Sequence, residues 1–250
     1  DVDIATSATP EEVMSIFTTT FPVGIEHGTV VVRFNHVGYE ITTFRSESDY
    51  TDFRHPDQVT FEASIEKDLA RRDFTVNAMA MDKHGQVIDP FNGRQDLQDH
   101  VLRSVGRATE RFEEDPLRIM RAARFVSQLN FCPEPDLLEA MKEKNLRIKE
   151  ISIERVHQEM IKLLQGQSAK AGLMLLLDAS ILSVLPELDG FSTEQLQACT
   201  DVNYKKCRSS TECWAAFLLS LPSIDTAAFI KEWRFSKREG KDIQKLMDDF

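Results

Sequence analysis

The sequence DVDIATSATPEEV, residues 1–13, places two aspartates one residue apart just before the start signal of a helix. Side chains alternate between the two faces of a strand, so Asp1 and Asp3 point the same way with Cα atoms roughly 7 Å apart. The helix start is a capping box with Thr9 as N-cap, a proline next to it, and Glu12 reaching back. The stretch therefore predicts a strand, a short turn and a helix, with an acidic pair displayed on the strand.

Three interpretations of the acidic pair compete. It can be a solvated strand face, a calcium loop, or a magnesium site for phosphoryl transfer, in which carboxylates hold metal ions that activate an attacking hydroxyl. Asp1, Asp3 and Glu12 match positions one, three and twelve of an EF-hand, but Ala5 and Thr6 stand where that loop needs an oxygen ligand and a glycine. The calcium loop is thereby excluded, and the pair alone leaves the other two interpretations open.

Composition sets the broad class of the chain. Its 250 residues suffice for one large domain or two small ones, and 42% hydrophobic with 28% charged residues is typical of a soluble globular protein. No apolar run reaches the roughly 18 residues of a membrane span, so we expect no membrane partner. Four cysteines without CxxC spacing indicate reduced thiols and a cytoplasmic location. The net charge of −11 argues against indiscriminate nucleic-acid binding but allows a local basic groove.

The secondary-structure signals change along the chain. Residues 28–44 and 75–90 read as β-hairpins, residues 45–68 as a mobile loop running into a short helix, and residues 100–106 as a last short strand. From about Glu110 onward the apolar residues recur with helical spacing, and no strand-like alternation returns. The expected architecture is a small α/β head followed by a helical body.

The densest polar stretch of the head is DLARRDFTVNAMAMD, residues 68–82. Arg71, Arg72 and Asp73 are adjacent, and Asn77 follows four residues after Asp73. These residues can be a solvated helix end, or they can be a phosphate clamp, because guanidinium groups match phosphate oxygens and stay charged. An acceptor such as Asp73 then holds a ribose hydroxyl. The GxxxxGK phosphate loop does not occur in the chain.

A second polar constellation is RFEEDPLRIMRAARF, residues 111–125. Asp115, followed by a proline, is a natural N-cap of the next helix, and capping alone explains this residue. Arg118 lies one turn further on the same side, and Arg121 and Arg124 continue at three-residue steps. Each step slips by about 60° around the helix, so Arg124 ends opposite Asp115 and one ligand is not expected to contact all four tips.

Asp115 and Arg118 together suggest a reader of nucleobases. A carboxylate accepts and a guanidinium donates, so the pair complements an amino group beside a ring acceptor, as in cytosine and adenine. Uracil and guanine present a carbonyl and a ring N–H at that edge. We therefore hypothesise that the pair selects C and A over U and G.

Residues 1–13, 71–82, 88–97 and 111–125, in this order and spacing, resemble the motifs of the class II tRNA nucleotidyltransferases. That family comprises the CCA-adding enzymes and the bacterial poly(A) polymerases. The resemblance covers roughly residues 1–165. Beyond that point it rests only on a helical body of the expected kind.

The resemblance implies an α+β fold: a small nucleotidyltransferase head with a mixed β-sheet and flanking helices, then an all-helical neck and body. The implied domains are a catalytic head over 1–106, a nucleotide-selecting neck over 107–166 and a body over 167–250. The family's glycine-rich strand–turn precedes the two aspartates, and its tail follows the body. We therefore expect this chain to be a fragment that lacks both.

The resemblance also implies roles for individual residues. Asp1 and Asp3 match the pair that binds Mg²⁺ in the family and are the expected catalytic residues. Arg124 has a competing expectation, either RNA contact or an ion pair. The expected nucleotide-binding residues are Arg71, Arg72, Asp73, Asn77, Glu114, Asp115, Arg118, Arg121 and Arg124.

The implied reaction is attack of the 3′-hydroxyl of tRNA on the α-phosphate of CTP or ATP, with Mg²⁺ as cofactor and pyrophosphate released. Residues 48–61 look like the flexible segment of relatives that add A, which favours CCA or A addition over CC alone. A poly(A) polymerase is the first alternative, and a catalytically silent nucleotide- or RNA-binding module is the second. Glu40 can approach the metals from a neighbouring strand, although a structural role is favoured. The sequence leaves the oligomeric state open.

Overall fold

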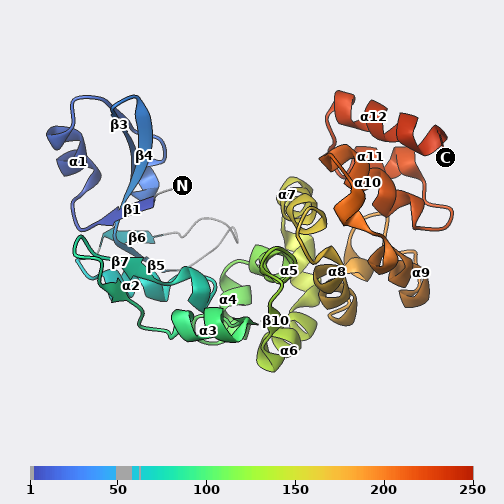
Figure 1. The fold of residues 1–250 in the computed structure, drawn as a ribbon, viewed down its shortest axis with the longest axis horizontal. Helices are drawn as coiled ribbons and strands as arrows, with labels where there is room; N and C mark the ends of the chain where they lie inside the picture. The colour runs from blue at the N-terminus through green and yellow to red at the C-terminus, as the bar shows by residue number, and fades with distance from the viewer. Residues whose placement is uncertain (1–2, 49–57, 62, 250) are drawn as a thin grey trace. The chain divides into compact units, whose positions relative to one another are not determined.

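The computed structural model describes residues 3–48, 58–61 and 63–249 of the chain. The chain forms two compact units, residues 1–93 and 94–250 (Figure 1). The first carries a mixed sheet with flanking helices and the second is almost entirely helical, which confirms the predicted α+β class. The predicted division into three domains stays a prediction. None of the described helices combines the length and the apolar character that a membrane span needs.

A four-stranded sheet organises the first unit. Its strand order is β1-β4-β3-β2, with β1 parallel to β4 and the other pairs antiparallel. The predicted hairpin at residues 28–44 is confirmed, since Asn35 and His36 between β3 and β4 have φ of 47° and 65°, as a two-residue hairpin turn requires. The strands are β1 (Asp3–Thr6), β2 (Thr20–Phe21), β3 (Thr29–Phe34) and β4 (Val37–Thr43).

One face of this sheet packs against α1 (Pro10–Ile16). The helix begins with the predicted capping box: the Thr9 hydroxyl accepts from the Glu12 N–H at 3.3 Å, and the Glu12 carboxylate accepts from the Thr9 N–H at 2.8 Å. Val13 of the helix and Val30 of β3 belong to the buried core beneath it. Because side chains alternate along a strand, Val31 and Glu40 face the other side of the sheet.

Residues 45–68 were predicted to be a loop running into a short helix; the helix is confirmed, but residues 45–48 and 58–61 form two strands, so the loop prediction was wrong there. Strands β5 (Arg45–Ser48) and β6 (Gln58–Phe61) pair antiparallel before α2 (Ile65–Ala70). The polar residues of β5 and β6 show no alternation of apolar and polar side chains. These short strands form because they pair with each other. The connection between them lies outside the described residues.

The remaining elements of the first unit are short. The predicted hairpin at residues 75–90 is confirmed, with two-residue strands that pair antiparallel. These elements are η1 (Ile25–His27), η2 (Thr75–Asn77), β7 (Ala80–Met81) and β8 (Val87–Ile88).

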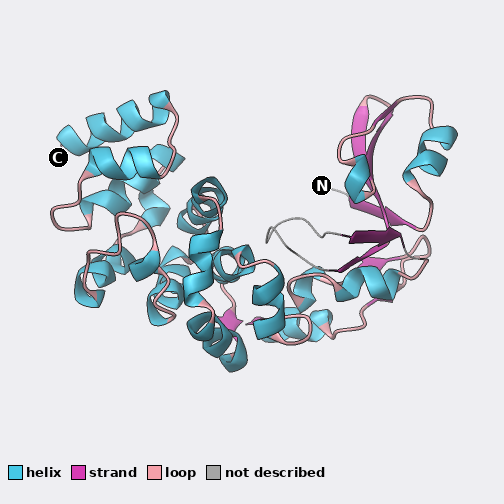
Figure 2. Cartoon of the chain, turned by 180° about the vertical axis from the view of Figure 1, so that it is seen from behind, coloured by secondary structure: helices cyan, strands magenta, loops and turns pink. Residues whose placement is uncertain are grey.

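The second unit consists of helices apart from two short strands (Figure 2). β9 (Val101–Leu102) is the predicted last strand, and β10 (Cys132–Pro133) pairs with it in parallel. The expectation that no strand follows Glu110 was therefore wrong, because a two-residue strand is too short to show alternation. The helices are α3 (Gly93–Asp99), α4 (Ala108–Glu114), α5 (Leu117–Leu129), α6 (Pro135–Glu143), α7 (Ile153–Leu164), α8 (Ala169–Asp178), α9 (Thr193–Gln197), α10 (Ser210–Leu219), α11 (Thr226–Glu232) and α12 (Lys237–Asp248), with the 3₁₀ turns η3 (Asn145–Glu150), η4 (Leu182–Val184), η5 (Ala198–Asp201) and η6 (Tyr204–Lys206).

Helix α5 is the centre of the first half of this unit and packs against both α7 and α8. The approach to α8 is close at Gly172, where a Cβ would lie 2.7 Å from the backbone oxygen of Ala123. A side chain at Gly172 would force the two helices apart. The spacing between α5 and α8 is thus fixed by the absence of a side chain.

An aromatic cluster joins α7 to α10, to α11 and to the segment between α11 and α12. His157 of α7 packs edge-on against Trp214 at 5.2 Å, and Trp233 stacks on Phe229 at 4.7 Å between ring centroids. The Nδ1–H of His157 donates to the backbone oxygen of Trp233 at 2.9 Å, since a carbonyl can only accept. Burial among aromatic side chains disfavours the charged form of this imidazole.

We expect this cluster to lose stability in acid. Burial lowers the pKa of His157 below its usual value of 6.5, although the Trp233 carbonyl and Glu239 oppose the shift. The folded state then binds fewer protons than the unfolded state, so its stability falls as the pH drops from 6.5 through the folded pKa. One proton limits the slope to about 1.4 kcal/mol per pH unit.

The two tryptophans of the chain both lie in the cluster, so their fluorescence during urea unfolding measures its stability. The measurement compares pH 7.5 with pH 5.5 in the natural protein and in His157→Asn. Asparagine can keep the Nδ1-type donor but does not titrate. An equal loss of stability in both proteins would contradict the prediction.

Candidate functional site

Of the acidic pair, Asp3 lies at the beginning of the sheet in the first unit. Asp3 begins β1, whereas Asp1 lies outside the described residues. In the parallel pairing of β1 with β4, Asp3 is directly opposite Glu40, and both residues are exposed. Their side chains share the face that α1 leaves uncovered. Glu40, for which the sequence favoured a structural role, thus lies beside the predicted catalytic aspartate.

Asp3 and Glu40 are suitable ligands for a divalent cation. Two carboxylates side by side repel each other, and hard oxygen donors of this kind are what Mg²⁺ prefers. Within residues 3–48, 58–61 and 63–249 no three His, Cys, Asp or Glu side chains gather as a metal site. Asp3 and Glu40 by themselves fit a divalent cation through their adjacency and their oxygen donors.

The arginine pair of the RRD sequence is organised by a buried carboxylate. Asp68, in α2, is 1% exposed and accepts from Arg71 at 2.9 Å and from Arg72 at 3.4 Å. It also accepts from the backbone N–H of Arg45 at 3.2 Å, which connects α2 to the start of β5. One acid thus holds two guanidinium groups at the C-terminal end of a short helix.

Arg72 retains capacity to bind an anion. Its side chain is 41% exposed, yet its Nε is buried and has no hydrogen-bond partner among the described residues. A buried N–H without a partner costs free energy, so a ligand oxygen that reached Nε would remove that cost. This geometry is consistent with the phosphate contact that the sequence predicts for Arg72.

Asp73 and Asn77 are brought together by the turn after α2. Asp73 is 7% exposed, and its Oδ1 accepts from the Phe74 N–H at 2.9 Å and from the Asn77 side chain at 3.2 Å. Asn77 belongs to η2, whose residue Thr75 is also buried. The predicted ribose contact would therefore come from a carboxylate held in place by its own turn.

The sequence IDPFNG, residues 88–93, packs against the backbone of this turn at Thr75. The Asp89 carboxylate accepts from the Gly93 N–H at 2.7 Å. A Cβ on Gly93 would lie 2.2 Å from the backbone oxygen of Thr75, so no side chain fits there. This motif thus acts on the nucleotide-binding candidates through the backbone.

We expect Asp68→Asn to weaken nucleotide binding about tenfold. Asparagine keeps the size of the side chain but removes the charge that holds Arg71 and Arg72, and a hydrogen bond to a charged group contributes about 1.5–3 kcal/mol. Titration with a triphosphate nucleotide checks the result, and Asp82→Asn in the β7–β8 turn is the matched control. Unchanged affinity in Asp68→Asn would show that the arginines do not depend on this acid.

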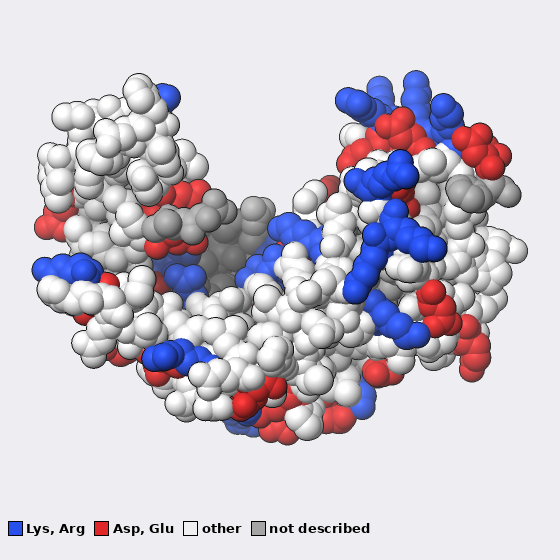
Figure 3. Space-filling model, viewed as in Figure 1, with Lys and Arg blue, Asp and Glu red and all other residues white. Residues whose placement is uncertain are grey.

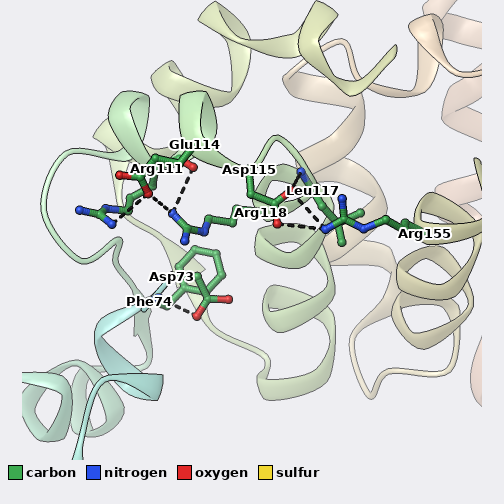
Figure 4. A network of polar contacts seen from close by, with 8 residues as sticks. All are labelled: Asp73, Phe74, Arg111, Glu114, Asp115, Leu117, Arg118 and Arg155. Atoms are coloured by element: carbon green, nitrogen blue, oxygen red, sulfur yellow. Dashed lines mark hydrogen bonds and ion pairs between the residues drawn. The ribbon is translucent and has the colours of Figure 1, made fainter. Parts of the chain in front are cut away.

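In the second unit, Glu114 and Asp115 have separate partners (Figure 4). Glu114 accepts from Arg118 at 2.5 Å and from Arg111 at 2.9 Å. Arg118 also donates to the backbone oxygen of Arg111 at 3.3 Å and is 8% exposed. The guanidinium of Arg118 is thus fixed by the last turn of α4.

Asp115 connects the start of α5 to α7. It caps α5 as the sequence predicts, since its Oδ1 accepts from the Leu117 N–H at 3.0 Å. Arg155 of α7 donates to both of its oxygens, at 3.3 Å and 3.1 Å. These contacts use three of the roughly four acceptor positions of a carboxylate, which leaves room for one donor from a ligand.

The two later arginines of the motif have other neighbours. The Nε of Arg124 lies 3.0 Å from the carboxylate of Glu159, whose side chain is 7% exposed. Its guanidinium carbon also lies 4.1 Å from the centre of the Phe125 ring, and that of Arg121 lies 5.5 Å from the same ring. Arg124 therefore forms the ion pair that was one of the roles expected for it. Contact between Arg124 and a nucleotide stays a prediction.

Sequence reasoning missed the residues that hold the candidates in place. Asp68 precedes Arg71 and Arg72 by three and four residues, the helical spacing of neighbours, so its role was readable from the sequence. Arg111 shows the same spacing to Glu114. Arg155 and Glu159 lie far along the chain from Asp115 and Arg124, and only the packing of α7 on α5 reveals them.

Comparison with known proteins places the chain in a family. Residues 1–103 match the model of the poly A polymerase head domain, and residues 130–191 match the probable RNA and SrmB-binding site of polymerase A. Sequence similarity extends across all of the chain: the CCA-adding enzyme of Lactobacillus helveticus is 42% identical over 252 residues, 100% of this chain and 63% of the relative. The chain belongs to the tRNA nucleotidyltransferase and poly(A) polymerase family.

Solved structures of this family agree with the fold. A crystal structure of the Bacillus stearothermophilus CCA-adding enzyme in complex with CTP has a TM-score of 0.92 and 40% identity, over 100% of this chain and 60% of that one. A tRNA nucleotidyltransferase complexed with a primer tRNA and an incoming ATP analogue has a TM-score of 0.61 and 28% identity, over 92% and 64%. The chain thus spans less than two thirds of the length of these relatives. Members of the family are generally metal-dependent.

Proposed function

We propose that this protein adds C and A nucleotides to the 3′ end of tRNA, using CTP and ATP and releasing pyrophosphate. The observation that carries the proposal is the pairing of Asp3 with Glu40 on the open face of the sheet. Carboxylates in that arrangement suit phosphoryl transfer from a nucleoside triphosphate. The similarity to CCA-adding enzymes over the full chain supports CCA as the product.

Asp3 and Glu40 are the described residues that would hold Mg²⁺, together with Asp1, which lies outside the described residues. When bound, the metal supplies a lowered pKa for the attacking hydroxyl and charge compensation for the leaving pyrophosphate. The protein's own contribution is to display these carboxylates on a rigid strand pair. Positioning of this kind accounts for much of the acceleration in phosphoryl transfer.

In this proposal, residues of each unit, taken separately, have roles in nucleotide binding. Arg72, with Arg71, neutralises triphosphate charge, and Asp73 and Asn77 position the ribose. Arg118 presents its donors to the base, held there by Glu114. Asp115 contributes the acceptor for the amino group of cytosine or adenine. Its orientation comes from Arg155 and from the capped start of α5.

A poly(A) polymerase is the second candidate, because the family model that matches residues 1–103 describes that head domain. The deciding experiment offers the complete protein a tRNA transcript without its 3′ end and each nucleoside triphosphate in turn, with Asp3→Asn as control. Two Cs and one A followed by a stop support CCA addition, whereas a long A ladder supports a poly(A) polymerase. No extension by folded protein would leave a nucleotide- or RNA-binding module.

A further inference from the structure

The dipeptide Asn92–Gly93 is the only place in the sequence where glycine follows asparagine. The backbone nitrogen of a residue can attack the side-chain amide of a preceding asparagine, and glycine has no Cβ to obstruct that approach. Asn92 is also exposed, so water reaches the products of such an attack. By sequence and exposure, this dipeptide is where the chain is most open to deamidation.

The fold holds the attacking nitrogen in a strong hydrogen bond. The Gly93 N–H donates to the Asp89 carboxylate at 2.7 Å, at the short end of the range for an N–H donor. Hydrogen bonds to an ionised acceptor are roughly twice as strong as neutral ones. Asn92 lies between the two partners with φ of 59°, in the turn that directly precedes α3.

The opposite side of Gly93 is closed by the segment that contains η2. Gly93 is buried, and a Cβ on it would lie 2.2 Å from the backbone oxygen of Thr75 and 3.0 Å from the sulfur of Met79. Atoms this close leave the Gly93 backbone little room to move. The approach of its nitrogen to the Asn92 side chain therefore requires that the hydrogen bond to Asp89 opens first.

The charge of Asp89 adds to this restraint. The attacking nitrogen must lose its proton, and a carboxylate at 2.7 Å opposes a second negative charge beside it. General surface charge does not single out this position, since acidic and basic side chains lie side by side in each unit on the face shown in Figure 3. The restraint on the Gly93 nitrogen thus comes from one specific carboxylate.

We propose that Asn92 is the principal site of spontaneous deamidation in this protein, and that Asp89 protects it in the folded state. In the reaction, the Gly93 nitrogen forms a bond to the side-chain carbon Cγ of Asn92, and the bond between Cγ and the amide nitrogen breaks. Ammonia leaves with the proton of the Gly93 nitrogen, which gives a five-membered cyclic imide. Water then opens the imide at either carbonyl, so the products at position 92 are aspartate and isoaspartate.

Isoaspartate at position 92 would disturb the turn that carries the predicted ribose contacts. Its main chain runs through the side-chain carbon and is one atom longer. Because Gly93 has no space toward Thr75, the extra atom must displace the backbone there or break the hydrogen bond to Asp89. η2 contains Asn77, which donates to Asp73 at 3.2 Å. We expect the isoaspartate form to bind ATP about tenfold more weakly, an effect that rests on the proposed function.

The test follows residue 92 with time in the complete protein at mildly alkaline pH, by chromatography and mass spectrometry of the peptide that contains it. In Asp89→Ala we expect deamidation of Asn92 to be about tenfold faster, because no charged acceptor holds the Gly93 N–H. Natural protein unfolded in urea should react at least as fast. The matched control is Asp82→Ala, which removes a carboxylate that accepts two backbone N–H groups at 2.8 Å in the β7–β8 turn, and it should keep the natural rate.

Circular dichroism verifies that Asp89→Ala is folded. If it is not, Asp89→Asn takes its place, since it keeps an acceptor without the charge and should still react several-fold faster than the natural protein. Equal rates at Asn92 in folded and unfolded natural protein would overturn the proposal. So would a slower reaction in the Asp89 variant, which would make the carboxylate a promoting base, or faster deamidation of another asparagine.

A second measurement isolates the effect on binding. Asn92→Asp carries the charge of the product without lengthening the main chain, so it should bind ATP as the natural protein does, whereas protein aged to isoaspartate should not. Equal affinity in the aged protein would overturn the predicted disturbance of the turn. Deamidation is measured without nucleotide or RNA, so if the natural protein neither binds ATP nor extends tRNA, the proposed function fails and the modification site stands.

Discussion

We expect Asp3→Asn to reduce nucleotide transfer by about 10³-fold while the first unit remains folded. A metal-bound carboxylate contributes several kcal/mol of charge stabilisation, and each 1.36 kcal/mol corresponds to tenfold in rate. Asp3 is exposed and begins β1, so its replacement leaves no cavity. Because the change also removes repulsion from Glu40, directly opposite, the melting temperature should stay equal or rise slightly.

The combination of lost activity with retained stability is what distinguishes a catalytic acid from a structural one. Single-turnover extension of tRNA measures the activity, and thermal unfolding measures the stability. Glu11→Gln on α1 is the matched control, since it removes an exposed acid from the same unit. Activity within tenfold of the natural protein in Asp3→Asn would contradict the assignment.

The second large effect concerns the choice of base. We expect Asp115→Asn to reduce discrimination against UTP and GTP by about 10- to 100-fold, since a well-placed pair of hydrogen bonds to a base distinguishes it by about 1–3 kcal/mol. Asparagine can still cap the Leu117 N–H through its oxygen. Its amide can also donate, which permits the carbonyl of uracil or guanine at that edge.

Ratios of kcat/KM for the four triphosphates check this prediction. Glu113→Gln serves as the control, because Glu113 is the exposed acid two residues before Asp115 and pairs with Lys144 at 2.8 Å. The Lys144 side chain lowers the pKa of Glu113, which is therefore charged near neutral pH. Unaltered selectivity in Asp115→Asn would show that the base is read by other groups.

Local signals in the sequence were sufficient for much of the fold. The capping box at Thr9 and the turn at Asn35 and His36 both act within a few residues, and both formed as expected. The strands β5 and β6 were missed because their pairing partner, rather than their own composition, makes them strands. Strand β10 was missed because two residues cannot display a period.

In the candidate site, too, features formed by residues close together in the sequence were predictable, whereas contacts between residues far apart were not. The grouping of Arg71, Arg72 and Asp73 is visible in the sequence, and so is the capping role of Asp115. The sequence offered Glu40 as a possible neighbour of the metals but favoured a structural role, because its position opposite Asp3 depends on the register of strands 37 residues apart. Nor could a helical wheel of α5 show that Asp115 would bond to a residue of α7.

The carboxylate shared by Arg71 and Arg72 has a consequence for the timing of catalysis. Two guanidinium groups and one buried carboxylate leave a local charge of about +1, so the arginines stay in place before any nucleotide arrives. Little rotamer entropy is then lost on binding, which favours rapid capture. In the proposed reaction, the same partial neutralisation weakens the hold on the pyrophosphate left after each transfer. If the proposed function holds, we therefore expect a short residence time for this product, which would let the protein bind the next triphosphate quickly.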